Sequence, residues 1–204
     1  MSAINPSRSA LVLIDMAHDF VDEGGTIADA GGADYRARAR GIVPKLAQLV
    51  EAARAAGVAV VYATDSHTPD DLELKKGPPH SMRGTHWAEI LPELAPADGD
   101  IVLPKTTYSA FQSTDIEAIL KERGISTLYM TGLHTDCCCR HTSGDAFQKG
   151  IDLVWVTDAL QAFTEEAHQG GLDYYKMYYA TEPERQFKTT GEVVADWQAV
   201  AEAA

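Results

Sequence analysis

Short apolar runs alternate along the chain with longer stretches of helical period, and this alternation constrains the fold more than any other feature. Strands that are apolar throughout are buried on both faces, as in a parallel sheet that helices cover on each side. The sequence therefore predicts an α/β fold of three α/β/α layers with a central parallel sheet of five to six strands. The apolar runs are ALVLID (10–15), VAVVYAT (58–64), IVLP (101–104), STLYMTG (126–132) and IDLVWVTD (151–158).

The segments between these runs carry helix signals. A helical period covers about 35–56 and stops at Gly57, while 114–124 and 135–150 each open with Thr-Asp and close at a glycine. An edge strand is expected near 185–190, before a final helix. We expect one domain over residues 1–204.

Composition narrows the class of partner. A net charge of −13 disfavours nucleic acid and anionic membranes as partners, so a neutral or small substrate fits better. No apolar run reaches the roughly 20 residues of a membrane span, and a cytoplasmic location is expected. The three cysteines are consecutive, which is unsuitable for a disulfide framework, so a free thiol is predicted.

Polar residues follow the predicted strands. In an open parallel sheet, ligands bind beyond the carboxyl ends of the strands, so these residues should meet at one edge. A carboxylate, an amine and a thiol among them suggest catalysis, although loop and cap residues are also often polar. The set is Asp15, Asp65 with His67, Lys105, the loop GLHTDCCCR and Asp158.

Cys138 is the candidate nucleophile. It lies in the first turn of a predicted helix, where the helix dipole and free amides favour a thiolate. Asp15 would take the thiol proton and pass it to departing ammonia, and Lys105 would offset the developing negative charge. The alternative is that all three cysteines are buried packing residues.

The segment after 58–64 is rich in metal-ligand residue types. Asp65 and His67 alternate as residues at a strand end do, and His80 can fold back to them through the turn at 77–79. One carboxylate with two imidazoles suits zinc, and also iron or manganese. Aspartate and histidine are also ordinary residues of an exposed loop.

Three blocks of sequence carry a family resemblance: ALVLIDMAHDF, LPKTTYSAFQSTDIEAIL and TGLHTDCCCRHTSGDAFQKG. Their order and spacing resemble the isochorismatase-like cysteine hydrolases, especially the nicotinamidase branch, over about residues 10–160. The resemblance implies the isochorismatase-like hydrolase fold and a catalytic triad of Asp15, Lys105 and Cys138.

The same resemblance implies the details of both sites. It places a cis peptide between Leu133 and His134, and an oxyanion hole formed by the backbone amides of His134 and Cys138. His134 departs from the small residue common at that position. The implied metal, most readily Zn²⁺ with Fe²⁺ or Mn²⁺ as alternatives, binds the pyridine nitrogen of the substrate. Its ligands would be Asp65, His67 and His80, with Glu73 as an optional fourth.

The resemblance favours an amidohydrolase that converts nicotinamide to nicotinate and ammonia through a cysteine thioester, with pyrazinamide as a related substrate and NAD salvage as its setting. Phe20, Tyr108 and Trp87 are candidate ring walls, and each can instead be a packing residue. Family members often form homo-oligomers, so the aromatic run at 173–179 is either core or a subunit contact. The alternatives are a cysteine amidase for another small amide, a hydrolase that uses metal-bound water, and a catalytically silent binding protein.

Overall fold

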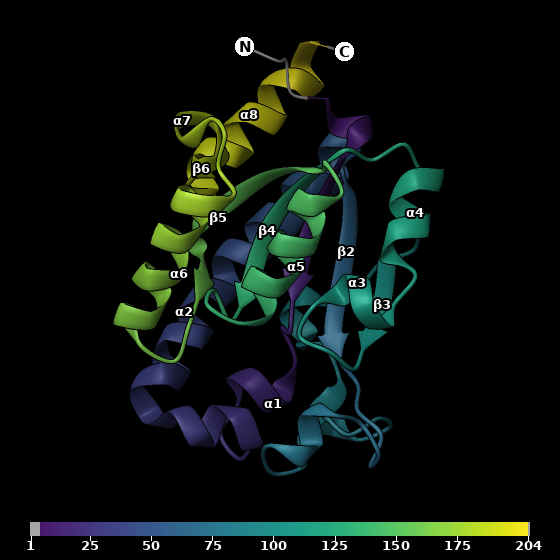
Figure 1. Cartoon of the computed structure of the whole chain (residues 1–204). Coiled ribbons are helices and arrows are strands. Elements are labelled where there is room, and N and C mark those ends of the chain that lie inside the picture. Colours follow the sequence, from purple (N-terminus) through teal and green to yellow (C-terminus); the bar gives the residue numbers. More distant parts are fainter. Residues whose placement is uncertain (1–4, 204) are drawn as a thin grey trace.

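The computed structural model describes residues 5–203, which fold around a six-stranded sheet (Figure 1). The strand order is β3-β2-β1-β4-β5-β6, and every neighbouring pair is parallel. The predicted fold class and the parallel sheet are confirmed. The strands are β1 (Ser9–Ile14), β2 (Ala59–Asp65), β3 (Ile101–Lys105), β4 (Thr127–Leu133), β5 (Asp152–Gln161) and β6 (Phe187–Lys188).

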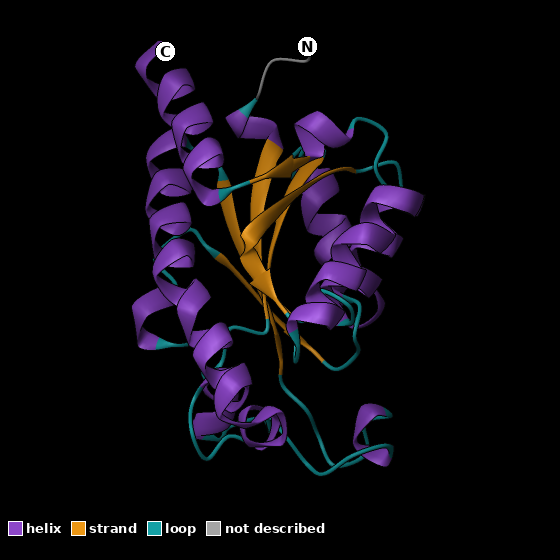
Figure 2. Cartoon of the chain, turned by 90° about the vertical axis from the view of Figure 1, so that its left-hand side faces the viewer, coloured by secondary structure: helices purple, strands orange, loops and turns teal. Residues whose placement is uncertain are grey.

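Helices cover both faces of this sheet (Figure 2). No helix among residues 5–203 is both long and apolar enough to cross a bilayer. The α-helices are α1 (His18–Val21), α2 (Thr26–Ala56), α3 (Ala110–Ser113), α4 (Ile116–Glu122), α5 (Cys138–Gln148), α6 (Glu165–Tyr178), α7 (Pro183–Gln186) and α8 (Thr190–Ala203). Short 3₁₀ turns are η1 (Pro6–Arg8), η2 (Glu73–Lys75), η3 (His86–Ala88) and η4 (Pro92–Leu94).

Two apolar cores lie on opposite faces of the sheet because successive strand side chains point to opposite sides. In β1, Leu11 and Leu13 pack into the core under α2 and α8. Val12 and Ile14 pack into the other core, to which α4, α5 and α6 contribute. Burial on both faces explains why the central strands are apolar at every position.

Two boundaries differ from the sequence prediction. Helix α2 begins at Thr26, well before the periodic segment, and its geometry is broken at Gly32 (φ 75°, ψ −176°). The predicted helix is the part after this break, and the helical stretch before it was not predicted. Strand β5 continues past a bulge to Gln161, where it pairs with Leu133, so Asp158 lies within the strand instead of ending it. Asp158 accepts a hydrogen bond from the Thr190 amide at 2.7 Å, which is a structural role.

The strand order brings the expected functional residues together. Asp15 directly follows β1, Asp65 ends β2, Lys105 ends β3, and the cysteine loop follows β4. These four strands are consecutive neighbours in the sheet, so their carboxyl ends form one continuous edge. The site is built at that edge.

Candidate active site

A buried ion-pair network forms the floor of the site. Asp15 and Lys105 have no exposed surface, and Asp65 has 1%. Lys105 Nζ lies 2.9 Å from Asp15 Oδ2 and also donates to Asp65 Oδ1. The Asp65 amide donates to Asp15 Oδ1 at 2.9 Å. One ammonium group is thus shared between two carboxylates.

This arrangement shifts the ionisation of Asp15. Burial raises the pKa of Asp15 to about 6, with a further contribution from the charge of Asp65, while Lys105 and the neighbouring Cys138 thiol oppose the shift. Burial alone would lower the pKa of Lys105, but the charges of Asp15 and Asp65 hold it well above its usual value. Lys105 is therefore a fixed cation, and Asp15 is a carboxylate that can gain and lose a proton near neutral pH.

Backbone geometry aims these groups. Asp15 has φ 54°, a left-handed conformation that is rare outside glycine and is frequent at functional sites. On the adjacent strand, Gly132 has φ 99°, and a Cβ there would lie 2.1 Å from the Ile14 carbonyl oxygen. Only glycine lets β4 approach β1 closely enough to bring the cysteine loop beside Asp15.

Cys138 is the first residue of α5 and is 4% exposed. The expectation of a resting thiolate is wrong: the hydrogen bond with Cys137 and burial raise the pKa of the Cys138 thiol well above its usual value, and Asp15 and Asp65 add to the shift against Lys105. With one cation already shared by two carboxylates, a third negative charge is disfavoured. The thiol therefore rests protonated beside Asp15.

The loop before α5 presents backbone donors. The peptide bond between Leu133 and His134 is cis, as the resemblance implied. The His134 carbonyl accepts from the amides of Cys137 (3.0 Å) and Cys139 (3.2 Å). Among residues 5–203, the amides of His134 and Cys138 donate to no protein acceptor, so both are free to bind an oxyanion.

Helix α6 and β5 hold this loop, which the sequence did not indicate. The Thr135 amide donates to the Gln161 carbonyl at 2.9 Å, and the Thr135 carbonyl accepts from the Tyr175 hydroxyl. The Thr135 hydroxyl bonds His168 Nδ1 at 2.8 Å. Both the Tyr175 and the His168 side chain therefore fix the loop by hydrogen bonds to Thr135.

The His134 side chain lies in an aromatic cluster. Its Nε2 is 2.8 Å from the Tyr35 hydroxyl, and its ring stacks on Phe163 at 4.3 Å and lies 5.8 Å from Phe20. Burial lowers the pKa of His134 to about 3, so the imidazole is neutral at physiological pH. Neither Tyr35 nor Phe163 stood out in the sequence, because their segments are far from His134 along the chain.

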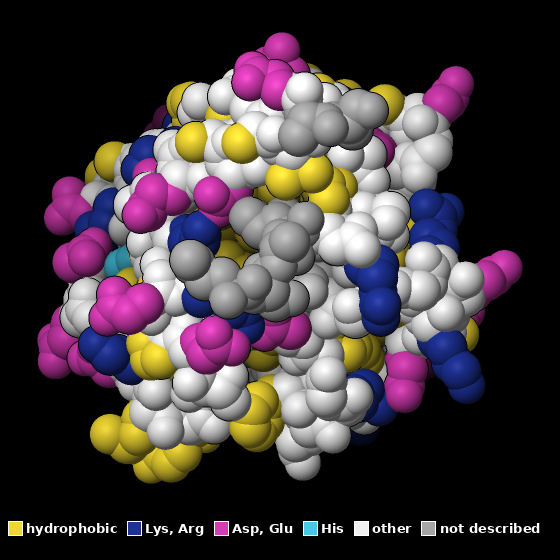
Figure 3. All heavy atoms as spheres, turned by 90° about the horizontal axis from the view of Figure 1, so that it is seen from above, with side chains coloured by type: hydrophobic (Ala, Val, Ile, Leu, Met, Phe, Trp, Pro, Cys, Tyr) yellow, Lys and Arg dark blue, Asp and Glu magenta, His cyan; other side chains and the backbone are white. Residues whose placement is uncertain are grey.

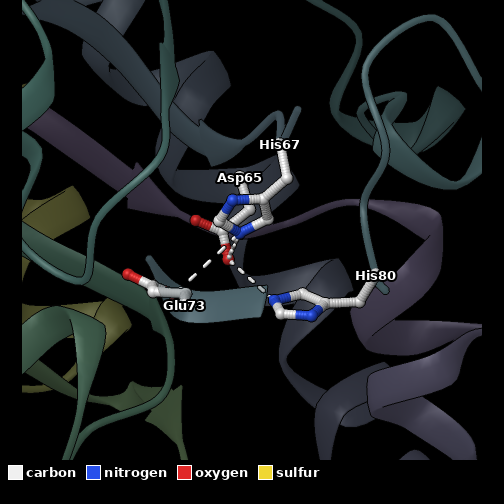
Figure 4. Close-up of side chains that lie close together, drawn as sticks. All are labelled: Asp65, His67, Glu73 and His80. Carbon is white, nitrogen blue, oxygen red and sulfur yellow. Dashed lines mark ion pairs between the residues drawn. The ribbon is translucent and has the colours of Figure 1, made fainter. Parts of the chain in front are cut away.

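The four metal-ligand candidates converge beside this network (Figure 4). One ligand atom from each lies within 4.8 Å of the others. His67 Nε2 is 3.5 Å from Asp65 Oδ2 and 3.9 Å from Glu73 Oε2, and His80 Nε2 is 3.8 Å from Asp65 Oδ2. Strand β2 supplies Asp65, while Glu73 comes from η2 in the long β2–β3 connection.

The surroundings of this group fit a divalent cation. His67 Nδ1 lies 3.3 Å from Asp71 Oδ2, and His80 Nδ1 lies 3.1 Å from the Pro78 carbonyl, so both Nε2 atoms face the centre. His67 Nε2 and Glu73 Oε1 are buried polar atoms without a hydrogen-bond partner among the described residues. A cation would satisfy them. Asp71, which orients His67, was not identified from the sequence.

The three candidate ring walls lie in different surroundings. Phe20 is buried and meets the His80 ring edge-on at 6.5 Å, between the cation group and His134. Burial raises the pKa of Tyr108, and its neighbours Cys137, Glu73 and Cys138 add to the shift, so its ring lies near the thiol and the cation group. Trp87 packs over Gly24, where a Cβ would lie 3.1 Å from its ring. A wall role for Trp87 stays a prediction.

The opposite end of the sheet contains a cavity of about 860 Å³. It is lined by residues at the amino ends of the strands, including Arg8, Asp152 and Arg185. On this face, lysine and arginine are interspersed with acidic side chains (Figure 3). Arg185 and Asp152 form an ion pair of 2.7 Å, so these two lining charges have a structural role.

Comparison with known proteins places the chain in a family. The isochorismatase domain matches residues 9–183. The ureidoacrylate amidohydrolase RutB of Rhizobium rhizogenes is 33% identical over 76% of this chain and 71% of that protein. The structure of N-carbamoylsarcosine amidase from Thermoplasma acidophilum has 33% identity and a TM-score of 0.77 over 90% of this chain and 96% of that one. The structure of the nicotinamidase PncA from Bacillus subtilis has 34% identity and a TM-score of 0.74, and the match covers 89% of this chain and 99% of that one. The chain belongs to the isochorismatase family and is a hydrolase of amide and related bonds.

Proposed function

We propose that the protein is a nicotinamidase, which hydrolyses nicotinamide to nicotinate and ammonia through a thioester on Cys138. The observation that carries this proposal is the shared carboxylate of Asp65. Its Oδ1 accepts from Lys105, which pairs with Asp15, while its Oδ2 faces His67 and His80. Asp65 therefore holds the cation group, which would position the ring, at a fixed place beside the Asp15–Lys105 pair, which serves the attacking thiol.

The first half-reaction forms the thioester. Asp15 takes the proton of the Cys138 thiol, and the sulfur attacks the carboxamide carbon. The amides of His134 and Cys138 donate to the resulting oxyanion. Collapse of the tetrahedral intermediate breaks the C–N bond, and Asp15 returns the proton to the leaving nitrogen, which departs as ammonia. A pKa near 6 lets Asp15 serve in both directions at neutral pH.

The second half-reaction repeats these roles with water. Asp15 removes a proton from a water molecule, whose oxygen attacks the thioester carbon at the same oxyanion hole. The C–S bond breaks and the sulfur regains the proton from Asp15. The product leaves as nicotinic acid, which gives its remaining acidic proton to solvent and becomes nicotinate. Lys105 keeps its charge throughout and stabilises each anionic intermediate.

Asp65, His67, His80 and Glu73 would hold the cation, for which Zn²⁺ is the first choice and Fe²⁺ or Mn²⁺ also suit the ligand set. When bound, it would offset the charge of Asp65 and supply an open position for a ring nitrogen. Phe20 and Tyr108 would flank that ring. The three free cysteines fit a reducing compartment, so we place the enzyme in the cytoplasm. Its proposed substrate and product would give it a role in pyridine nucleotide salvage.

Relatives about as identical to this chain as the nicotinamidase PncA are named for other small amides, ureidoacrylate and N-carbamoylsarcosine. The choice of substrate is therefore the point to test. The test is ammonia release from a panel of matched amides by the zinc-loaded enzyme. Nicotinamide and pyrazinamide carry a ring nitrogen, and benzamide has the same shape without one. In isonicotinamide the ring nitrogen stands at a different position relative to the carboxamide. Ureidoacrylate and N-carbamoylsarcosine represent the rival class.

We expect kcat/KM for nicotinamide to exceed that for benzamide by about 100-fold or more, because only the former offers a ligand to the cation. Removal of zinc should erase this preference. Equal rates on nicotinamide and benzamide, or fastest turnover of a ureido compound, would overturn the assignment to nicotinamide. Full resistance to iodoacetamide with complete loss on chelation would instead identify a hydrolase that uses metal-bound water.

A further inference from the structure

We propose that His18, His86 and Glu89 form a second divalent-cation site, suited to Zn²⁺, at the junction of α1 and η3. This site shares no residue with the Asp65 group. One ligand atom from each of the three side chains lies within 4.8 Å of the others. The two imidazole rings are 3.9 Å apart, and His86 Nδ1 is 3.2 Å from Glu89 Oε2.

The backbone holds the three ligands in place. The His18 amide donates to the Glu89 carbonyl at 3.1 Å, and the Glu89 amide donates to the His86 carbonyl at 3.0 Å. An antiparallel bridge joins Ala17 to Ile90, next to both segments. The ligands therefore come from two segments that are already bonded to each other, so little order must be gained when an ion binds.

A carboxylate orients the buried histidine as the second shell of a zinc site does. His18 Nδ1 is 2.5 Å from Asp22 Oδ2, which leaves Nε2 as the metal-binding nitrogen. Asp22 is itself fixed, because Arg40 Nη2 donates to its Oδ1 at 2.5 Å. This chain of contacts sets the tautomer and direction of the His18 ring.

The ligand types and their exposure define the ion. Two imidazoles and one carboxylate are a common zinc set, with water completing the tetrahedron. The His18 residue is 8% exposed, whereas the side chains of His86 and Glu89 are 59% and 67% exposed, so an ion enters from solvent. The net charge of −13 favours the approach of cations.

The site is connected to the cation group near Cys138. Asp19, next to His18, accepts a hydrogen bond from the amide of Ser81, which follows His80. An ion at the second site would hold α1 against η3 and so steady the segment that carries His80. We expect it to stabilise the fold around the active site without touching the substrate.

The test is the zinc content of the full chain after loading and gel filtration. Wild type should retain about two Zn²⁺ per chain, and His86→Ala and Glu89→Gln about one. His80→Ala should also retain about one, and the His80→Ala/His86→Ala double variant none. His141→Ala and Glu122→Gln, which change an exposed histidine and an exposed acid on α4 outside the site, should retain about two.

These outcomes separate the second site from the proposed function. If only the Asp65 group binds zinc, wild type retains one ion and His86→Ala loses none, which overturns the inference. If only the second site binds, His86→Ala loses its ion while His80→Ala does not, and the nicotinamidase proposal is overturned instead. The zinc-dependent rise in Tm should shrink in Glu89→Gln and persist in Glu122→Gln.

Discussion

The thiol site and the cation group lie side by side but are built differently. Asp15 and Lys105 lie at strand ends, fully buried, and Cys138 begins a helix. The cation group takes Asp65 from a strand end, but Glu73 and His80 come from the β2–β3 connection and are partly exposed.

This difference separates chemistry from recognition. The groups that make and break bonds are held by the sheet, where backbone positions vary little. The groups that would bind the ring nitrogen lie partly on a loop, where sequence can change without disturbing the sheet. We infer that the thiol site defines the reaction and the loop defines which amide is presented to it. The predictions below test that division.

The largest effect is expected from Cys138→Ala. Removing the nucleophile should lower kcat for ammonia release by about 10⁴-fold or more, because the remaining groups cannot form the thioester. Zinc content should be unchanged, since no cation ligand is altered. Cys139→Ala is the matched control, because the Cys139 thiol points to the Thr131 carbonyl at 3.8 Å. Similar rates for the two variants would contradict the nucleophile assignment.

Lys105→Met should damage both groups at once. It leaves Asp15 and Asp65 as two buried carboxylates without their shared cation, and removal of one partner of a buried pair costs about 3–5 kcal/mol. Urea denaturation should show this loss of unfolding free energy together with loss of activity. An unfolding free energy within about 1 kcal/mol of wild type would show that Lys105 does not link the groups.

His80→Ala should separate the two groups. We expect zinc binding to weaken by about 100-fold or more, since loss of a direct ligand should cost at least as much as the ~10- to 100-fold of an outer-shell partner, with a matching loss of kcat/KM for nicotinamide. The rate at which iodoacetamide alkylates Cys138 should stay close to wild type, because His80 pairs with Asp65 but with none of Cys138, Asp15 and Lys105. If alkylation falls in parallel with zinc binding, the division between reaction and recognition is wrong.

His134→Gln should have the smallest effect, on acid stability. The pKa of His134 is about 3 in the fold against 6.5 for a free histidine, so the unfolded chain binds the extra proton between these values. Neutral His134 stabilises the fold above pH 6.5, and this contribution falls as pH drops. The variant should lose about 2 kcal/mol less than wild type between pH 6.5 and pH 5. Identical slopes in pH-dependent urea titrations would contradict a buried neutral His134.

The sequence predicted the strand-end residues because a parallel sheet brings its carboxyl ends to one edge. Knowing where the strands end was enough to place Asp15, Lys105 and Asp65. Asp158 was misplaced because β5 extends beyond the apolar run that predicted it. Glu73 could be named only by family resemblance, since no local pattern fixes how its loop folds.

Contacts between distant segments could not be predicted. The Tyr35–His134 bond depends on how α2 passes the cysteine loop, and the pairing of His18 with His86 depends on a bridge between separate loops. The resting state of Cys138 was also missed, because it depends on how two carboxylates share one lysine. Homo-oligomer formation stays a prediction, with Met177 and Tyr178 exposed on α6 as its candidate contact.

The most direct measurement is a crystal structure of the zinc-loaded Cys138→Ala variant with nicotinamide. The account predicts the ring nitrogen in contact with the ion held by Asp65, His67 and His80, and the carboxamide carbon next to the position of the missing sulfur, with its oxygen towards the amides of His134 and residue 138. A ring nitrogen turned away from the ion, or a carboxamide outside reach of that position, would contradict it.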